Sequence, residues 1–349
     1  MQQQILDILQ RVIHPESGEN IVAAGFVAGI ADDAGTITVT LRFRKPRDPF
    51  AASIRRQCEQ LLAQELPSAE VKVEIEQPQK PQQTEKKSFA DKIGKVIAVA
   101  SGKGGVGKST VTANLAAALA RSGYRIGILD ADIYGPSQPT MFGCEDAAPE
   151  ARSIDGTDAI IPVTVAGGIK LMSLGFFVGR DDAMLWRGPM ATSALRQLVH
   201  QTLWGELDFL LIDLPPGTGD VHLSIISELR IDGAVIVSTP QQVAVADVIR
   251  GVAMFRNPSV NIPLLGIIEN MAWFTPAELP QNRYYIFGRE GAVKFAAENG
   301  IEVLGHIPVI ESVAQSSDNG CPVAAGDSPT AEYYLTAARR VVEKCSQNP

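Results

Sequence analysis

Apolar runs in the second part of the chain alternate with segments of helical periodicity. The runs are continuous, as in strands buried on both faces: KVIAVAS, RIGILDAD, FLLIDLP, GAVIVST, LLGIIEN and EVLGHIP. The segments between them place apolar residues at helical spacing. This repeated order predicts an α/β domain over residues 94–349, with a mostly parallel sheet flanked by helices.

The first part of the chain has a different pattern. ILDILQRVI and SIRRQCEQLLAQEL have helical spacing, whereas TITVTLRFR and EVKVEIE alternate as strands do. They predict a small α+β domain over residues 1–77. Residues 78–93 are rich in Pro, Gln and Lys and have no apolar period, so we expect them to form a linker.

Composition narrows the choice of partners. A formal charge of -8 over 349 residues disfavours broad electrostatic binding to nucleic acid or to anionic lipid. No apolar run is long enough to span a bilayer, and the first residues, MQQQILDILQRV, lack the features of a secretion signal. Four cysteines without a C-x-x-C pair are typical of reduced thiols. We therefore expect a cytoplasmic protein that binds neither nucleic acid nor membrane.

One glycine-rich stretch carries the clearest chemistry. GKGGVGKS follows a predicted strand, precedes a predicted helix and fits the phosphate-binding pattern G-x-x-x-x-G-K-[ST]. Its glycines let backbone N–H groups converge on phosphate, while Lys108 adds a cation and the Ser109 hydroxyl is a magnesium ligand. The expected nucleotide contacts are Gly102, Lys103, Gly104, Gly105, Val106, Gly107, Lys108, Ser109 and Thr110.

Acidic residues end two further strands. Asp213 ends FLLIDLP and is suited to hold magnesium through water, and the loop after it, residues 215–220, is a candidate sensor of the γ-phosphate. Asp130 and Asp132 end RIGILDAD at the same sheet edge. We expect Asp132 to orient the attacking water and Asp130 to be a possible metal ligand; the alternative is that either residue only caps or ligates through water.

The loop KGGVGKS contains a second lysine, Lys103, and in this it resembles the deviant Walker A loop of the SIMIBI class of ATPases. The resemblance implies a homodimer that encloses two ATP molecules, in which Lys103 crosses to the nucleotide of the partner. It also implies hydrolysis of ATP with Mg²⁺, which we expect to be slow because a switch needs a long-lived ATP state. The alternative is a solvated surface lysine.

Longer stretches are similar to the Mrp/ApbC-type iron-sulfur cluster carriers. They are DADIYGPSQPTMFG, MSLGFF, WRGPM, DFLLIDLPPGTGD, VSTPQQVAVADVIRG and GIIENMAWF, and the front domain resembles that of iron-sulfur assembly factors. This resemblance implies a [4Fe-4S] cluster, and scaffold or apo-client proteins as partners. It also implies adenine contacts by Asn270 and by an Ile307-Pro308 turn, and an interface or switch role for Arg187.

The chain departs from that family at the cluster site. A C-x-x-C pair normally follows the ENM strand, whereas here WFTPAELPQNRYYIFG contains no cysteine. No iron-sulfur ligand is identified. Cys58 falls on an apolar helix face and is expected to be a packed thiol, and Cys345 is expected to have a core or a frayed-end role. Either Cys144 or Cys321 could supply one ligand per chain. The four histidines lack the spacing of metal ligands.

The aromatic segment that stands in place of the cysteine pair, residues 273–287, has two interpretations. It is either a surface for protein docking or dimer contact, or a set of rings that cover the sheet. For the whole protein the alternative is a Min/Par-like positioning ATPase that binds membrane or DNA. Phosphoryl transfer to a small substrate is a third possibility, although no acceptor pocket is legible.

Overall fold

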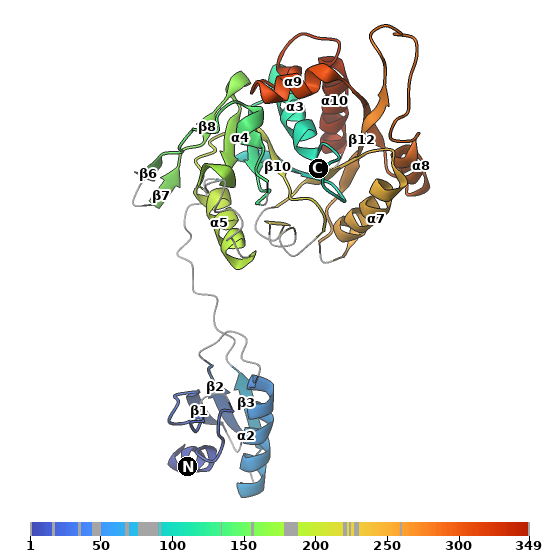
Figure 1. The fold of residues 1–349 in the computed structure, drawn as a ribbon. Coiled ribbons are helices and arrows are strands. Elements are labelled where there is room, and N and C mark those ends of the chain that lie inside the picture. Colours follow the sequence, from blue (N-terminus) through green and yellow to red (C-terminus); the bar gives the residue numbers. More distant parts are fainter. Residues whose placement is uncertain are drawn as a thin grey trace. The chain divides into compact units, whose positions relative to one another are not determined.

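The computed structural model describes residues 2–15, 18–33, 36–43, 50–66, 70–75, 90, 92–133, 135–154, 157–177, 188–218, 222, 225–226, 230–258 and 260–347. Within it the chain divides into two compact units, residues 1–86 and 87–349 (Figure 1). Arg187, residues 219–220 and nearly all of the expected linker lie outside the described residues.

The first unit packs two helices on a three-stranded sheet. Its elements are α1 (Gln2–Leu9), β1 (Val27–Asp33), β2 (Thr36–Leu41), α2 (Ala51–Glu65) and β3 (Glu70–Ile75), with the strands in the order β1-β2-β3. Cys58 and Leu62 of α2 are fully buried in its core, so the prediction of a packed thiol at Cys58 is confirmed. Burial raises the pKa of the Cys58 thiol to about 12.

Strand β1 has no counterpart among the predicted elements. It pairs antiparallel with β2, and the register shifts between Val27 and Gly29. Such a bulge adds one residue and breaks the two-residue alternation that identifies a strand. The two apolar positions, Val27 and Ile30, both pack against the core although they are three residues apart.

The second unit contains an eight-stranded sheet in the order β13-β12-β11-β4-β10-β5-β9-β8. Its strands are β4 (Ile93–Ala100), β5 (Ile126–Asp130), β8 (Val163–Thr164), β9 (Lys170–Ser173), β10 (Leu207–Asp213), β11 (Gly233–Ser238), β12 (Leu264–Phe274) and β13 (Val303–Val309). All neighbouring pairs are parallel except β8 and β9. This confirms the predicted α/β fold with a mostly parallel sheet.

Helices cover both faces of this sheet, each with its own core. One face carries α3 (Lys108–Arg121) and α10 (Ala331–Gln347), and the other carries α5 (Gly188–Gln201), α7 (Gln242–Arg256) and α8 (Gly291–Glu298). The remaining elements are α4 (Gln138–Met141), β6 (Ala151–Ile154), β7 (Thr157–Ile160), η1 (Ala166–Gly168), η2 (Leu174–Phe176), α9 (Glu311–Asp318) and η4 (Val323–Ala325). Both faces of the central strands are therefore buried, which explains their continuous apolar sequences.

Two boundaries differ from the sequence prediction. Ile307 and Pro308 lie inside β13 and do not form a turn, so that prediction is wrong. A proline is tolerated there because β13 is an edge strand, where one side has no neighbour to pair with. Trp273 and Phe274 belong to β12, so the aromatic segment begins within the sheet.

Candidate functional site

The carboxyl ends of three adjacent strands bring the predicted site residues together. β10 lies between β4 and β5, so Asp213 and Asp130 end neighbouring strands and are paired in register. The loop after β4 leads into α3 beside them. Ligands of open α/β sheets bind at this edge, where the direction of the chain crossovers reverses.

A cleft of about 220 Å³ opens over the glycine-rich loop. Its lining contains Lys103, Gly104, Gly105, Gly107, Lys108, Ser109, Thr110 and Asp132, together with Ser101, Met141 and Pro216. Seven of the nine expected nucleotide contacts therefore line one cavity. Of the other two, Val106 is buried and Gly102 packs against α7.

Backbone conformation explains why glycines occupy this loop. Gly107 begins α3 from the left-handed region, at φ 81°, and a Cβ there would lie 2.3 Å from Nδ2 of Asn270. Gly102 lies against the backbone of another element, because a Cβ there would lie 2.4 Å from the carbonyl carbon of Asp247 in α7. Both glycines allow the loop to pack closely on its neighbours.

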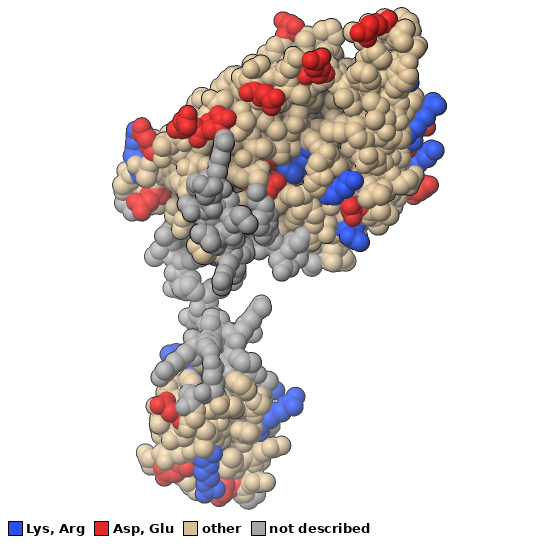
Figure 2. Space-filling view, viewed as in Figure 1, with Lys and Arg blue, Asp and Glu red and all other residues tan. Residues whose placement is uncertain are grey.

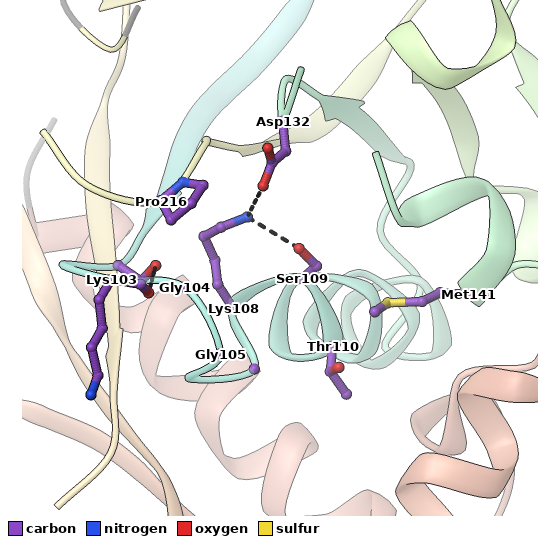
Figure 3. A pocket seen from close by; sticks show the side chains of 11 residues that line it. Lys103, Gly104, Gly105, Lys108, Ser109, Thr110, Asp132, Met141 and Pro216 are labelled. Carbon is purple, nitrogen blue, oxygen red and sulfur yellow. Dashed lines mark hydrogen bonds and ion pairs between the residues drawn. The ribbon is translucent and has the colours of Figure 1, made fainter. Parts of the chain in front are cut away.

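Lys108 occupies the centre of the cleft (Figure 3). Its ammonium lies 2.5 Å from Oδ1 of Asp213, 3.1 Å from Oγ of Ser109 and 3.9 Å from Oδ2 of Asp132. The side chain is 6% exposed, and that of Asp213 is fully buried. Lys108 therefore neutralises the carboxylate that is expected to face magnesium.

Lys103 lies on the other side of the loop. Figure 3 shows its side chain directed away from the Lys108 ammonium. The hydrogen bond that the structure gives its Nζ is long, 3.5 Å to Oε1 of Gln241. The two lysines of the loop thus have different surroundings within a few residues of each other.

Asp130 is held below the cleft and does not line it. Its carboxylate accepts hydrogen bonds from the backbone N–H groups of Asp132 (3.2 Å) and Gln138 (3.1 Å) and from the Ser173 hydroxyl (3.0 Å). Burial, together with the nearby charge of Asp213, raises the pKa of Asp130 to about 7. These contacts correspond to the capping alternative, and Asp132 is the member of the pair that reaches the cleft.

The two expected adenine contacts lie outside the cleft lining. The side-chain amide of Asn270 donates a hydrogen bond to the carbonyl of Val106 (2.9 Å), which fixes the phosphate loop to β12. Pro308 is buried in β13. Asn270 therefore has a structural role in holding the phosphate loop.

Two contributors to the site were not among the residues predicted from the sequence. Oγ1 of Thr112 lies 3.1 Å from Oδ1 of Asp213, and Nε2 of Gln138 lies 2.9 Å from Oδ2 of the same carboxylate. Thr112 lies one helical turn after Lys108, so its position follows once the helix is known. Gln138 lies eight residues after Asp130, inside the stretch DADIYGPSQPTMFG that carries the family resemblance, but neither that resemblance nor periodicity indicated its contact with Asp213.

The cysteines do not form a cluster site among the described residues. No group of three or more His, Cys, Asp and Glu side chains there is arranged to hold a metal ion. Cys345 is buried, in agreement with a core role, and Cys144 is half-buried, with a thiol pKa raised to about 11 by burial and by Glu145. Cys321 is exposed. The glycines preceding these last two residues, Gly143 and Gly320, are in backbone contact.

The aromatic segment divides into a packed part and an exposed part. Trp273 packs edge-on against Tyr333 of α10 at 6.3 Å between ring centroids, and the Arg283 guanidinium lies 4.3 Å from its ring centroid. Phe274 and Tyr284 exchange two backbone hydrogen bonds of 2.8 Å. They close a loop of residues 275–283. We name residues 275–288 the β12 hairpin, and in it Leu279, Tyr284, Tyr285 and Ile286 are exposed. Each interpretation of the segment therefore applies to part of it, and docking stays a prediction.

Other surfaces were candidates for membrane or nucleic-acid contact. The apolar face of α10 is buried, through Tyr334, Ala338 and Val341 among others, and so it packs on the sheet. Across the described part of the chain, no helix combines the length and hydropathy needed to cross a membrane. On the face shown in Figure 2, the Lys and Arg side chains of described residues are interspersed with Asp and Glu.

Comparisons with known proteins agree with this geometry. The family model described as NUBPL iron-transfer P-loop NTPase matches residues 92–342, and the model for an iron-sulfur cluster assembly protein matches residues 2–75. An iron-sulfur cluster carrier protein from Synechocystis is 38% identical over 347 residues, which cover 98% of this chain and 97% of that protein.

Solved structures show the same fold. A nucleotide-binding protein from Archaeoglobus fulgidus, determined in complex with ADP, is 40% identical, with a TM-score of 0.60, over 70% of this chain and 94% of its own. The MinC:MinD cell division complex from Aquifex aeolicus gives a TM-score of 0.52 at 21% identity, over 72% of this chain and 96% of its own. At that identity the similarity shows the fold alone.

Proposed function

The chain belongs to the NUBPL iron-transfer P-loop NTPase family, and on that premise we propose that it is a dimeric, ATP-hydrolysing protein of iron-sulfur cluster assembly and transfer. The family match confirms the resemblance seen in the sequence. Scaffold and apo-client proteins are its proposed partners. The separate matches to residues 2–75 and 92–342 support a division into domains 1–77 and 94–349 with residues 78–93 as linker.

The residues of the cleft fit nucleotide phosphates and a magnesium ion. A Cβ built at Gly104 or Gly105 meets nothing within 4 Å, so the loop leaves open space where phosphate approaches. The α3 N-terminus and Lys108 supply positive charge, while Ser109 and Asp213 supply the oxygen atoms that magnesium prefers. Bound magnesium would supply charge that stabilises the phosphoryl oxygens during transfer.

The proposed roles follow from position. Lys108 binds the phosphates, after leaving Asp213, and Asp132 at the cleft wall orients the attacking water. Lys103 acts in the second subunit, because its side chain is directed away from the cleft centre of its own chain. This orientation of Lys103 is the observation that carries the dimer proposal. A cation contributed in trans accelerates phosphoryl transfer by about 10³-fold or more in comparable enzymes.

Mixing two inactive variants tests the trans role of Lys103. Lys103→Ala keeps its own phosphate lysine, and Lys108→Ala keeps the lysine that is offered to the partner. If Lys103 acts in trans, about half of the dimers in a 1:1 mixture contain one chain of each variant, and each of these mixed dimers has one complete site of two. The mixture then recovers up to about a quarter of wild-type ATP hydrolysis. Full activity of Lys103→Ala alone, or no recovery on mixing, would refute the proposal.

The cysteines of this chain do not fit direct carriage of a [4Fe-4S] cluster as the family pattern has it. The chain contains no C-x-x-C pair, and Cys58 and Cys345 are buried in separate cores. We therefore propose that it serves cluster assembly without itself ligating the cluster. Anaerobic reconstitution with iron and sulfide should leave the protein colourless and free of iron; about four irons per dimer would contradict this.

A further inference from the structure

Gln138 joins three parts of the site although it does not line the cleft. It is the first residue of α4 and is fully buried. Its backbone N–H donates to Asp130 (3.1 Å), and its side-chain Nε2 donates to the carbonyl of Ser109 (3.0 Å) and to Oδ2 of Asp213 (2.9 Å). A single residue thus contacts the phosphate loop and both strand-end carboxylates.

The partners of the Gln138 amide fix its orientation. A backbone carbonyl and a carboxylate oxygen are both acceptors, so the NH₂ end of the amide has to face them, and both of its protons are used. The opposite atom, Oε1, is buried and has no hydrogen-bond partner among the described residues. Leaving a buried acceptor without a hydrogen bond is unfavourable. The side chain keeps this orientation because the two hydrogen bonds donated by Nε2 outweigh that cost.

The contacts of Asp213 show why such a support matters. Oδ1 accepts from the Lys108 ammonium at 2.5 Å, and Lys108 is also the cation expected to bind phosphate. When Lys108 turns to phosphate, the buried carboxylate loses its charged partner. Gln138 on Oδ2 and Thr112 on Oδ1 are the contacts that remain, and neither of these side chains is needed at the phosphates.

We propose that Gln138 is a positioning residue, which holds the Asp213 carboxylate against the phosphate loop while its charged partner changes from Lys108 to magnesium. This role of Gln138 rests on the proposed function, because it presupposes that the cleft binds nucleotide with magnesium. Gln138 acts through Asp213 and Ser109 and does not touch the nucleotide. Supporting residues of this kind typically change metal affinity by about 10- to 100-fold when they are removed.

The test compares Gln138→Ala with Asn114→Ala. Asn114 is an equally buried amide on α3 whose side chain bonds the backbone of Thr110 and Ala324 (both 2.9 Å) but not Asp213. Binding of a fluorescent ADP analogue is measured first in EDTA and then over a magnesium titration. We expect Gln138→Ala to raise the magnesium concentration at half-effect by about 10-fold, with affinity in EDTA changed less than about 2-fold. Asn114→Ala is expected to leave the magnesium midpoint at the wild-type value.

A purely structural role for Gln138 predicts a different result. Thermal unfolding would then shift for both variants while the magnesium midpoint stayed constant, and the proposal would be overturned. Gln138→Met keeps the side-chain volume and removes both donors, so it replaces Gln138→Ala if the smaller residue prevents folding. If the wild-type protein binds no ADP analogue in either condition, the proposed function itself is refuted, and the role of Gln138 with it. That outcome is distinct from an unchanged magnesium midpoint.

Discussion

The nucleotide cleft and the β12 hairpin present opposite kinds of surface. At the cleft, the polar groups of Lys108 in its lining and of Asp213 behind that lining are buried and contact side chains from several elements. In the hairpin, Tyr284 and Ile286 are apolar and exposed, and the contacts that hold the segment come from its base at Trp273 and Phe274. Substitutions that break the close packing or the buried contacts of the phosphate loop should therefore affect folding, whereas those at exposed residues of the hairpin should leave folding unchanged.

The largest effect on stability is expected from Gly102→Ala. The new Cβ would collide with the α7 backbone at Asp247, and a backbone atom cannot move aside as a side chain can. We expect a loss of about 3 kcal/mol in the free energy of unfolding, measured by urea denaturation.

Gly104→Ala is the matched control, because a Cβ there meets nothing within 4 Å. Its free energy of unfolding should stay within about 0.5 kcal/mol of wild type. Equal losses in the two variants would show that the close packing at Gly102 is not what makes the loop sensitive.

The buried Asp130 should make stability depend on pH. Because its folded-state pKa is raised from 3.8 to about 7, its contribution is present in full below the unfolded-state pKa and is lost as pH rises through about 7. Relative to Asp130→Asn, wild type should lose roughly 2 kcal/mol of stability between pH 5 and pH 8. Urea denaturation across this range measures the difference, and a constant difference would contradict the raised pKa.

Trp273→Ala tests the packed base of the hairpin. The substitution removes the contacts with Tyr333 and Arg283, and we expect a loss of about 1.5 kcal/mol. The ATP-binding affinity should be unchanged, because Trp273 does not line the cleft. A variant as stable as wild type would show that the Trp273 ring does not stabilise the packing of the hairpin base on α10.

The smallest effect is expected from Ile286→Ser, at an exposed residue that follows the pairing of Tyr284 with Phe274. Ile286 is 63% exposed, so its replacement should change the free energy of unfolding by less than about 0.5 kcal/mol. A larger loss in the free energy of unfolding would mean that the Ile286 side chain packs within the fold. Because this variant keeps its stability, any change in dimerisation or client capture could be assigned to the surface itself.

The main elements and the phosphate site of the second domain could be predicted because their signals lie in short contiguous stretches of sequence. The phosphate loop is a contiguous stretch between a strand and a helix, and parallel strands bring their carboxyl ends to one edge, so Lys108, Asp132 and Asp213 converge as expected. Strand β1 was missed because its bulge breaks the alternation. The turn at Ile307-Pro308 was wrong because an edge strand accepts a proline.

By itself, the sequence determined the α/β class, the phosphate loop and the absence of a cysteine pair after Asn270, since each depends on residues adjacent in the chain. Only the tertiary structure decided that Gln138 supports Asp213, that Asp130 lies beneath the cleft and that Asn270 secures the phosphate loop. Those contacts join residues 75 to 164 positions apart along the chain or depend on burial. Hydrophobic periodicity reports which face of an element is buried but not which polar group another element places there.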